Sequence, residues 1–278
     1  MTDIIPFAPG PRSPQAVAVA AERLHAAFVD QRACAPVREL IGPADVAAAY
    51  QVQQVVNARR LANGAIVVGR KIGITSQAVQ RQLNVDQPDF GVLFADMARR
   101  SGDAVALTSL LQPRVEGEVA FMLARDVDEP SMSRRELESA VAYAVAAIEI
   151  VDSRIQDWDI SLADTIADNA SSGLFVLGTE QVPLHEVEPR EVELEMWMDD
   201  VRVSGGSGQD CLGDPLLALA WLAQTCLEYG APLRQGEIVL SGALGPLVPV
   251  RTGCTVRAEI TGLGSVCVDF ISGANLGS

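Results

Sequence analysis

Three glutamates are the residues of this sequence best suited to act together chemically. Glu116 and Glu118 lie two residues apart in RVEGEVAFML, a run that alternates as a strand does. Residues i and i+2 of a strand point to the same face, with Cα atoms roughly 7 Å apart, so the two carboxylates share one side of a sheet. On a face open to water the pair would be screened and without consequence. In a cleft it must be protonated or held by a cation.

Glu149 supplies a third carboxylate. It lies in AAIEIV, a run so apolar that we expect a buried strand, where a carboxylate without a partner is costly. A helix between the two strands would return the chain to the same sheet, where Glu149 could lie beside the first pair. Three carboxylates without a nearby histidine form an oxygen-rich site, which suits Mg²⁺ or Mn²⁺ better than zinc or copper.

Lys71 and Asp89 are candidates for proton transfer. Lys71 follows an apolar strand between Gly69 and Gly73, where small neighbours let another group approach the backbone. It could orient a substrate carboxylate or move a proton, or it could be an ordinary cation at a strand end. Asp89 follows Pro88 in a segment that we expect to be a loop, where it could equally be a turn-forming aspartate. The polar run DTIADNASSG at 164–173 could cap a helix or offer hydroxyl and amide groups to a ligand.

Several other kinds of site are excluded. With only His25 and His185, neither a histidine-rich metal site nor a Ser-His-Asp arrangement is credible. The glycine-rich run GGSGQDCLGDP lacks the spacing of a phosphate-binding loop. A net charge of −15 disfavours a nucleic-acid partner. The five cysteines include no CxxC pair, which is typical of reduced thiols.

The sequence also predicts where the protein works. No window approaches the roughly 18 consecutive apolar residues of a membrane span, so we expect no membrane partner. The first residues lack a basic segment followed by an apolar one, and we therefore expect a cytoplasmic protein rather than a secreted one.

The elements that must position these residues divide the chain into three parts: a Pro-rich tail at 1–14, a helical or lid region at 15–80, and a β-rich catalytic region at 81–278. The expected helices lie at 15–33, 44–63, 76–84, 133–146 and 215–229, and a hairpin is expected to turn at 261–265. Short strands fill most of the second two-thirds. The pattern predicts an α+β fold, with a mixed β-roll or barrel-like sheet and flanking helices.

Four blocks of the sequence together resemble the 2-oxopent-4-enoate (2-hydroxypenta-2,4-dienoate) hydratases of the fumarylacetoacetate hydrolase superfamily. The resemblance covers about residues 35 to 272. The blocks are VVGRKIGITSQAVQRQLNVDQPDFGVLFADM, LQPRVEGEVAFML, AIEIVDSRIQDWDISLADTIADNASSG and LRQGEIVLSGALGPLVPV.

By this resemblance, the family's functional residues fall on six positions of the chain. The metal ligands fall on Glu116, Glu118 and Glu149, and the active-site lysine and pocket aspartate fall on Lys71 and Asp89. A further pocket position falls on Ser171, which is followed by another serine. The resemblance also implies the superfamily's mixed β-roll.

The implied activity is the Mg²⁺- or Mn²⁺-dependent addition of water to 2-hydroxypenta-2,4-dienoate, giving 4-hydroxy-2-oxopentanoate in the meta-cleavage catabolism of aromatic compounds. The implied assembly is a homo-oligomer, a pentamer or decamer, and association with the pathway's aldolase or decarboxylase is conceivable. Two alternatives stay open. One is 4-oxalocrotonate decarboxylase, a sister family that resembles the chain in the same carboxylates and lysine. The other is a 2-oxo-acid binding protein without turnover.

Overall fold

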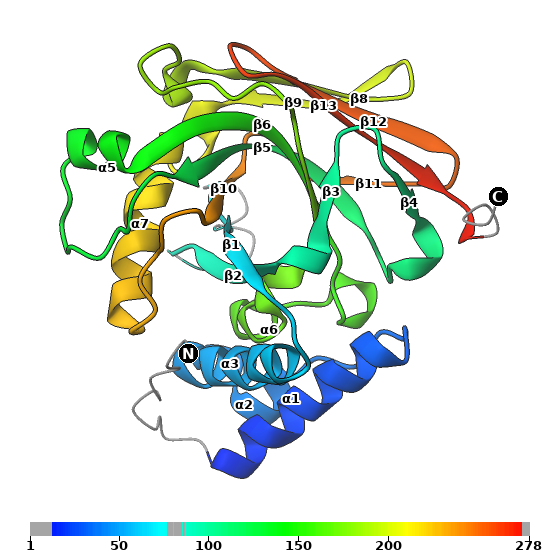
Figure 1. Cartoon of the computed structure of the whole chain (residues 1–278). Coiled ribbons are helices and arrows are strands. Elements are labelled where there is room, and N and C mark those ends of the chain that lie inside the picture. The colour runs from blue at the N-terminus through cyan, green and yellow to red at the C-terminus, as the bar shows by residue number, and fades with distance from the viewer. Residues whose placement is uncertain (1–12, 77–79, 81–84, 86, 274–278) are drawn as a thin grey trace.

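The computed structural model describes residues 13–76, 80, 85 and 87–273. Figure 1 shows three parts stacked on one another: a layer of N-terminal helices, a strongly curled sheet, and a second sheet on the opposite side of it. The predicted tail at 1–14 and the predicted helix at 76–84 fall almost entirely outside the described residues.

The N-terminal layer is built from three helices, of which the first and third have side-chain N-caps. Ser13 caps the first, accepting from the backbone N–H of Ala16, and Asp45 caps the third, accepting from that of Ala48. The helices predicted at 15–33 and 44–63 are confirmed, with shorter ends. The elements are α1 (Pro14–Val29), α2 (Arg38–Ile41) and α3 (Val46–Ala62).

One buried aspartate fastens this layer to the rest of the protein. Asp164 lies in α6 (Leu162–Ala167) and is fully buried. Its carboxylate accepts from the backbone N–H groups of Val37 and Arg38, both at 2.8 Å, and pairs with the Arg38 guanidinium at 2.8 Å. Because α6 also lies against the curled sheet, the layer and the sheet pack as neighbours (Figure 1).

The curled sheet has the order β2-β1-β10-β5-β6-β7-β3, with β11 paired to β5. β2 and β3 lie at opposite ends of this order, although only residues 95–97 separate them in sequence. The sheet must therefore roll up until its two edges meet. Among the described residues no ladder joins β2 to β3, so the expected roll is confirmed as an open one. The strands are β1 (Val67–Gly73), β2 (Asp89–Phe94), β3 (Ala98–Arg100), β5 (Arg114–Leu123), β6 (Val141–Val151), β7 (Ser172–Leu177), β10 (Ile238–Ala243) and β11 (Val248–Pro249).

The second sheet has the order β4-β13-β12-β8-β9 and packs against β6 and β7. Val256, Ala258 and Ile260 of β12 alternate inward and are almost fully buried, as a half-exposed sheet requires. The hairpin predicted at 261–265 joins β12 to β13 and is confirmed. The strands are β4 (Ala104–Ala106), β8 (Glu193–Met198), β9 (Val201–Ser207), β12 (Cys254–Ile260) and β13 (Gly264–Ile271).

The helix predicted at 133–146 is too long. Only α5 (Arg134–Ala140) is helical, and β6 begins directly at Val141. The run VAYAVA contains alanine and alternating valine, which fit either a helix or a strand locally. Pairing with β5 decides the outcome, because Val145 and its neighbours lie in register with Ala120 and complete the ladder.

The remaining long helix agrees with its prediction. α7 (Pro215–Glu228) is capped by Asp214 and packs against β10. In the described part of the chain, none of the helices is both long and apolar enough to span a membrane.

Candidate active site

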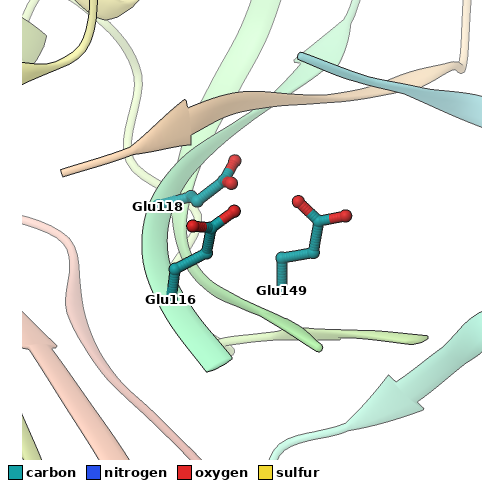
Figure 2. A group of neighbouring side chains, drawn as sticks. All are labelled: Glu116, Glu118 and Glu149. Carbon is teal, nitrogen blue, oxygen red and sulfur yellow. The ribbon is translucent and has the colours of Figure 1, made fainter. Parts of the chain in front are cut away.

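The three glutamates come together on neighbouring strands. The register of β5 and β6 sets Glu116 directly opposite Glu149, and Glu118 follows two residues along β5 on the same face. One carboxylate oxygen from each lies within 4.8 Å of the others. Figure 2 shows the three carboxyl groups gathered on the same side of the two strands. The alternation of side chains along β5 puts Glu116 and Glu118 on one face, and the register between β5 and β6 brings Glu149 beside them.

This carboxylate cluster is short of hydrogen-bond donors, with Glu118 and Glu149 fully buried and Glu116 half-buried. The Gly242 N–H donates to Glu118 Oε2 at 2.7 Å, but among the described residues Glu118 Oε1 and both oxygens of Glu149 have no hydrogen-bond partner. Burial, followed by repulsion from Glu149 and Glu116, raises the pKa of Glu118 well above its usual value. Burial also raises the pKa of Glu149 to about 7, against the lowering effect of Lys71. Crowded carboxylates with orphaned oxygens fit a divalent cation, whose charge would offset their repulsion.

Lys71 lies beside this cluster. It is in the interior of β1, not at a strand end, and its side chain is almost fully buried. Its Nζ lies 3.2 Å from Glu149 Oε2 and donates to the Ala170 carbonyl at 3.0 Å. Burial alone would lower the pKa of Lys71, but the carboxylates of Glu149 and Asp89 outweigh it and raise the pKa above its usual value. Lys71 is therefore held as an ammonium.

Lys71 is also the only lysine among the 21 basic residues of the chain. Every other residue of this set is an arginine, so the lysine at position 71 is an exception in the chain. A guanidinium is bulkier than an ammonium and has no neutral form at ordinary pH. The composition thus contained a signal for Lys71 that the strand pattern did not supply.

Asp89 faces Lys71 from the adjacent strand. It is the first residue of β2, so its expected place in a loop is wrong, because pairing with Gly73 of β1 extends the strand to it. Thr165 Oγ1 donates to Asp89 Oδ2 at 3.1 Å, whereas Oδ1 has no hydrogen-bond partner in the part of the chain that the structure describes. Burial raises the pKa of Asp89, although the Lys71 charge opposes the shift.

Gly73 keeps the space between these two groups clear. A Cβ built on it would lie 2.3 Å from Asp89 Oδ1 and 3.3 Å from Lys71 Nζ. Any larger residue would displace one of them. The absence of a side chain at this point is therefore part of the site.

Ser171 is the third polar group at this end of the site. Its Oγ is buried without a hydrogen-bond partner, whereas the Oγ of Ser172 donates to the Asn169 carbonyl at 2.7 Å. Of the two neighbouring serines, Ser171 is thus the one that lines the cavity. The run at 164–173 does both things considered for it, because it forms α6 and also supplies polar groups to the site.

These residues surround one cavity of about 1130 Å³. Lys71, Asp89, Glu116 and Ser171 line it, and Glu118 and Glu149 adjoin it through the cluster. The structure therefore brings together all six residues singled out from the sequence. Sequence reasoning missed Arg114 and Trp158, which line the cavity, and the Gly242 N–H, which donates to Glu118. Gly73 and the run that contains Thr165 and Ala170 had been marked, but their contacts with Asp89 and Lys71 had not.

A second hollow, of about 990 Å³, contains none of these six residues. It lies over β8, β9 and β12, and its lining includes Glu193, Glu195, Arg202 and Glu259.

The chain matches the family model of the fumarylacetoacetate hydrolase C-terminal region over residues 56–271. It is 52% identical over 255 residues to the TodF product hydratase of Pseudomonas putida F1, covering 92% of this chain and 95% of that protein. It is 51% identical over 254 residues to the 2-keto-4-pentenoate hydratase of Burkholderia vietnamiensis, covering 91% of this chain and 97% of that protein.

A solved structure agrees with these matches. The 4-oxalocrotonate decarboxylase of Pseudomonas putida G7, complexed with magnesium and adipate, superposes with a TM-score of 0.89 at 29% identity, covering 93% of this chain and 98% of that one. The two proteins therefore share one α+β fold. The chain belongs to the fumarylacetoacetate hydrolase family, in the branch of the 2-keto-4-pentenoate hydratases.

Proposed function

We propose that this protein is a divalent-cation-dependent hydro-lyase that adds water to 2-hydroxypenta-2,4-dienoate and forms 4-hydroxy-2-oxopentanoate. The observation that carries the proposal is the meeting of a buried carboxylate cluster, a charged lysine and a free aspartate oxygen around one cavity. The names of relatives at 51–52% identity over more than nine-tenths of the chain support this substrate.

Glu116, Glu118 and Glu149 would hold the cation. Their donors are all carboxylate oxygens, which favours Mg²⁺ or Mn²⁺. When bound, the cation supplies charge neutralisation and Lewis-acid polarisation of the substrate's 2-oxygen. The chain's own groups then have to orient the substrate and move protons.

Lys71 orients the substrate and stabilises the negative charge that develops on it. Its ammonium donates to the Ala170 carbonyl, forms an ion pair with Glu149 at 3.2 Å, and lines the cavity, where a further N–H can reach the substrate. A charged ammonium there favours the substrate's carboxylate and negative charge developing on its 2-oxygen. Because the carboxylates around it keep it protonated, Lys71 acts as a donor rather than as a base.

Asp89 moves the protons. Thr165 occupies its Oδ2, so Oδ1 is the oxygen available for transfer. Ketonisation of the dienoate takes the proton of the 2-hydroxyl and adds one at C5, which leaves a 3-ene conjugated to the 2-oxo group. Water then adds its oxygen at C4 while C3 gains a proton. A carboxyl group whose pKa is raised by burial holds its proton more firmly than an exposed one and can give it as well as take it. Ser171 Oγ, which has no hydrogen-bond partner among the described residues, can hold the water or a substrate oxygen.

A decarboxylase acting on the six-carbon 2-oxo-3-enedioate is the second candidate. The likeness to the solved decarboxylase favours it, as does Arg114, which lines the cavity and stacks on Trp158 at 4.5 Å. Arg114 has no ion-pair partner in the part of the chain that the structure describes, so it could accept a second carboxylate. The higher identity to the hydratases favours hydration.

The test is an ultraviolet assay with freshly generated 2-hydroxypenta-2,4-dienoate, with Mg²⁺ or Mn²⁺ and then with chelator, run beside the six-carbon diacid. Cation-dependent loss of the dienoate with 4-hydroxy-2-oxopentanoate as product supports hydration. Reaction of the diacid alone, with release of carbon dioxide, would establish the decarboxylase. Tight binding of either substrate without turnover would instead make the protein a 2-oxo-acid binding protein.

We also propose a cytoplasmic homo-oligomer, a pentamer or decamer, working next to the aldolase or decarboxylase of a meta-cleavage pathway. The resemblance to the hydratase branch supports this proposal. Light scattering on the purified protein tests the assembly, and a monomeric mass would refute it.

The division of the chain into a lid region at 15–80 and a catalytic region at 81–278 likewise stays a prediction. Both parts are expected to pack as one unit, since β1 of the first part pairs with β2 and β10 of the second, so limited proteolysis near residue 80 that leaves the two fragments associated would support it.

A further inference from the structure

A strained turn carries two of the groups that the cavity uses. Asn169, Ala170 and Ser171 have φ angles of 55°, 52° and 53°, so three consecutive residues other than glycine are left-handed. Such residues are costly and persist only where their surroundings enforce them. All three are buried. The turn presents the Ala170 carbonyl to Lys71 Nζ and the Ser171 hydroxyl to the cavity.

Arg154 enforces this conformation by binding the chain at both ends of the turn. Its Nη2 donates to the carbonyl of Asp168, directly before the turn, and its Nη1 donates to the carbonyl of Ser172, directly after it, at 2.6 Å. Its Nε pairs with Asp168 Oδ1 at 2.5 Å, and Nη1 also reaches the Asp152 carbonyl at 2.7 Å. The guanidinium therefore spans the turn from a nearly buried position.

The turn has other contacts: within it, the Ser171 N–H donates to the Asp168 carbonyl at 3.0 Å and the Ser172 N–H to the Asn169 carbonyl. The Asn169 side chain pairs with the backbone of Val92 on β2, accepting from the N–H at 2.8 Å and donating to the carbonyl at 2.9 Å. The Ser171 carbonyl accepts from the Asp152 N–H at 2.8 Å. Only Arg154 joins the residue before the turn to the residue after it through one side chain, among the hydrogen bonds of the described residues.

We infer that Arg154 is a positioning residue for the reaction, because it sets the left-handed turn that aims the Lys71 ammonium and delivers the Ser171 hydroxyl. The inference rests on the proposed function, since it gives Arg154 a role through Lys71. It also explains why the residue is an arginine. A lysine has one nitrogen and cannot span two carbonyls on either side of a turn, whereas the planar guanidinium can.

The first experiment compares Arg154→Lys with Arg38→Lys, a control arginine that also binds a carboxylate and a carbonyl but does not touch the turn. Arg154→Lys should lower kcat roughly 10- to 100-fold, as expected for a misplacement near 1 Å. Mg²⁺ affinity should stay within about twofold, because the carboxylates that would hold the cation lie on β5 and β6. Arg38→Lys should keep the wild-type kcat. A wild-type kcat in Arg154→Lys would overturn the inference.

A second substitution tests whether Arg154 changes kcat through the left-handed turn. Glycine adopts a left-handed φ without cost, so adding Ala170→Gly to Arg154→Lys should recover several-fold of the lost kcat. In a Lys71→Met background, Arg154→Lys should slow the residual reaction little further. If it slowed that background by the same factor as the wild type, Arg154 would act on something other than Lys71, and the inference would fail.

The sole lysine offers a readout that does not depend on turnover. In protein labelled with ¹⁵N-lysine, the one side-chain ammonium resonance belongs to Lys71 and reports its hydrogen bond to Ala170. Arg154→Lys and Arg38→Lys each add a second lysine, so this measurement uses Arg154→Gln and Arg38→Gln. Arg154→Gln should shift or broaden the Lys71 resonance, Arg38→Gln should not, and adding Ala170→Gly to Arg154→Gln should reverse the change in part. An unchanged resonance in Arg154→Gln would overturn the inference.

This readout separates the two proposals. If the wild-type protein fails to hydrate the dienoate, the proposed function is refuted, while the Lys71 resonance still decides whether Arg154 acts on that lysine. Should Arg154→Lys fail to fold, Asp168→Asn removes the charge that pairs with Arg154 and keeps the carbonyl that it binds. A shifted Lys71 resonance in that variant supports the inference, and an unshifted one counts against it.

Discussion

Gly73→Ala should disable the site without disturbing the backbone. Gly73 has no left-handed φ, so alanine can adopt its conformation. The added methyl would lie 2.3 Å from Asp89 Oδ1, however, which is about 1 Å short of ordinary contact. Asp89 must move away by roughly that distance. A misplacement of about 1 Å can cost on the order of 10²-fold in rate, equivalent to about 2.7 kcal/mol of transition-state stabilisation.

The assay is the steady-state loss of dienoate absorbance, together with calorimetric titration of Mg²⁺. We expect kcat to fall about 10²-fold, while Mg²⁺ affinity changes little, because the three atoms nearest the new methyl belong to Asp89 and Lys71 and not to the glutamates. Gly64→Ala is the matched control. Its Cβ would meet nothing within 4 Å, but its φ is +89°, so this variant should lose some stability and keep its rate.

A double-mutant cycle makes the reasoning refutable. If the methyl acts by displacing Asp89, then in an Asp89→Asn background Gly73→Ala should cost little more, because the displaced group no longer transfers protons. An unchanged kcat in Gly73→Ala would refute the steric argument. An equal loss in both backgrounds would show that Asp89 is not the group affected.

Four further predictions concern the cation and Lys71. Glu118→Gln keeps an acceptor for the Gly242 N–H but loses the charge of a metal ligand. Mg²⁺ affinity and turnover should therefore fall together, by more than the roughly 10- to 100-fold that is typical of an outer-shell partner. Full activity with unchanged metal content in that variant would contradict the ligand assignment. Lys71→Met removes a cation 3.2 Å from Glu149, so it should bind Mg²⁺ at least as tightly as the wild type while losing turnover, and a normal rate would end the catalytic role of Lys71. Mg²⁺ at 100 times its Kd should stabilise the protein by about 2.7 kcal/mol, raising Tm by roughly 5 to 10 °C for a chain of this size, and neither chelated protein nor Glu118→Gln should show that rise. Burial raises the pKa of Glu149 to about 7 without metal, so its proton must leave before a cation binds. Mg²⁺ affinity should therefore fall as the pH drops through 7, and calorimetry in two buffers should measure the released proton. An Mg²⁺ affinity that stays constant between pH 6 and 8 would count against this role of Glu149.

The local features of the chain followed from its sequence. The i, i+2 spacing of Glu116 and Glu118 required a shared face, since a strand has a period of two. The capped helices and the hairpin after Ile260 were readable because their signals lie within a few residues of each other. The long blocks that resemble the hydratases marked Lys71 and Asp89, although neither position looked unusual by its own pattern.

Tertiary structure decided everything that depends on two distant segments meeting. The β5–β6 register set Glu149 opposite Glu116, and the same pairing turned residues 141–146 from the expected helix into strand. The pairing of β1 with β2 brought Asp89 to Gly73 and out of its expected loop. Arg154, at the end of a β-rich run, carried no sequence signal for a role at the site. Periodicity reports which face a residue takes within its own element, whereas the partner across the sheet is selected by the packing of the whole chain. The sequence by itself therefore determined the kinds of groups in this site, and only the fold decided which atoms of those groups stay free to react.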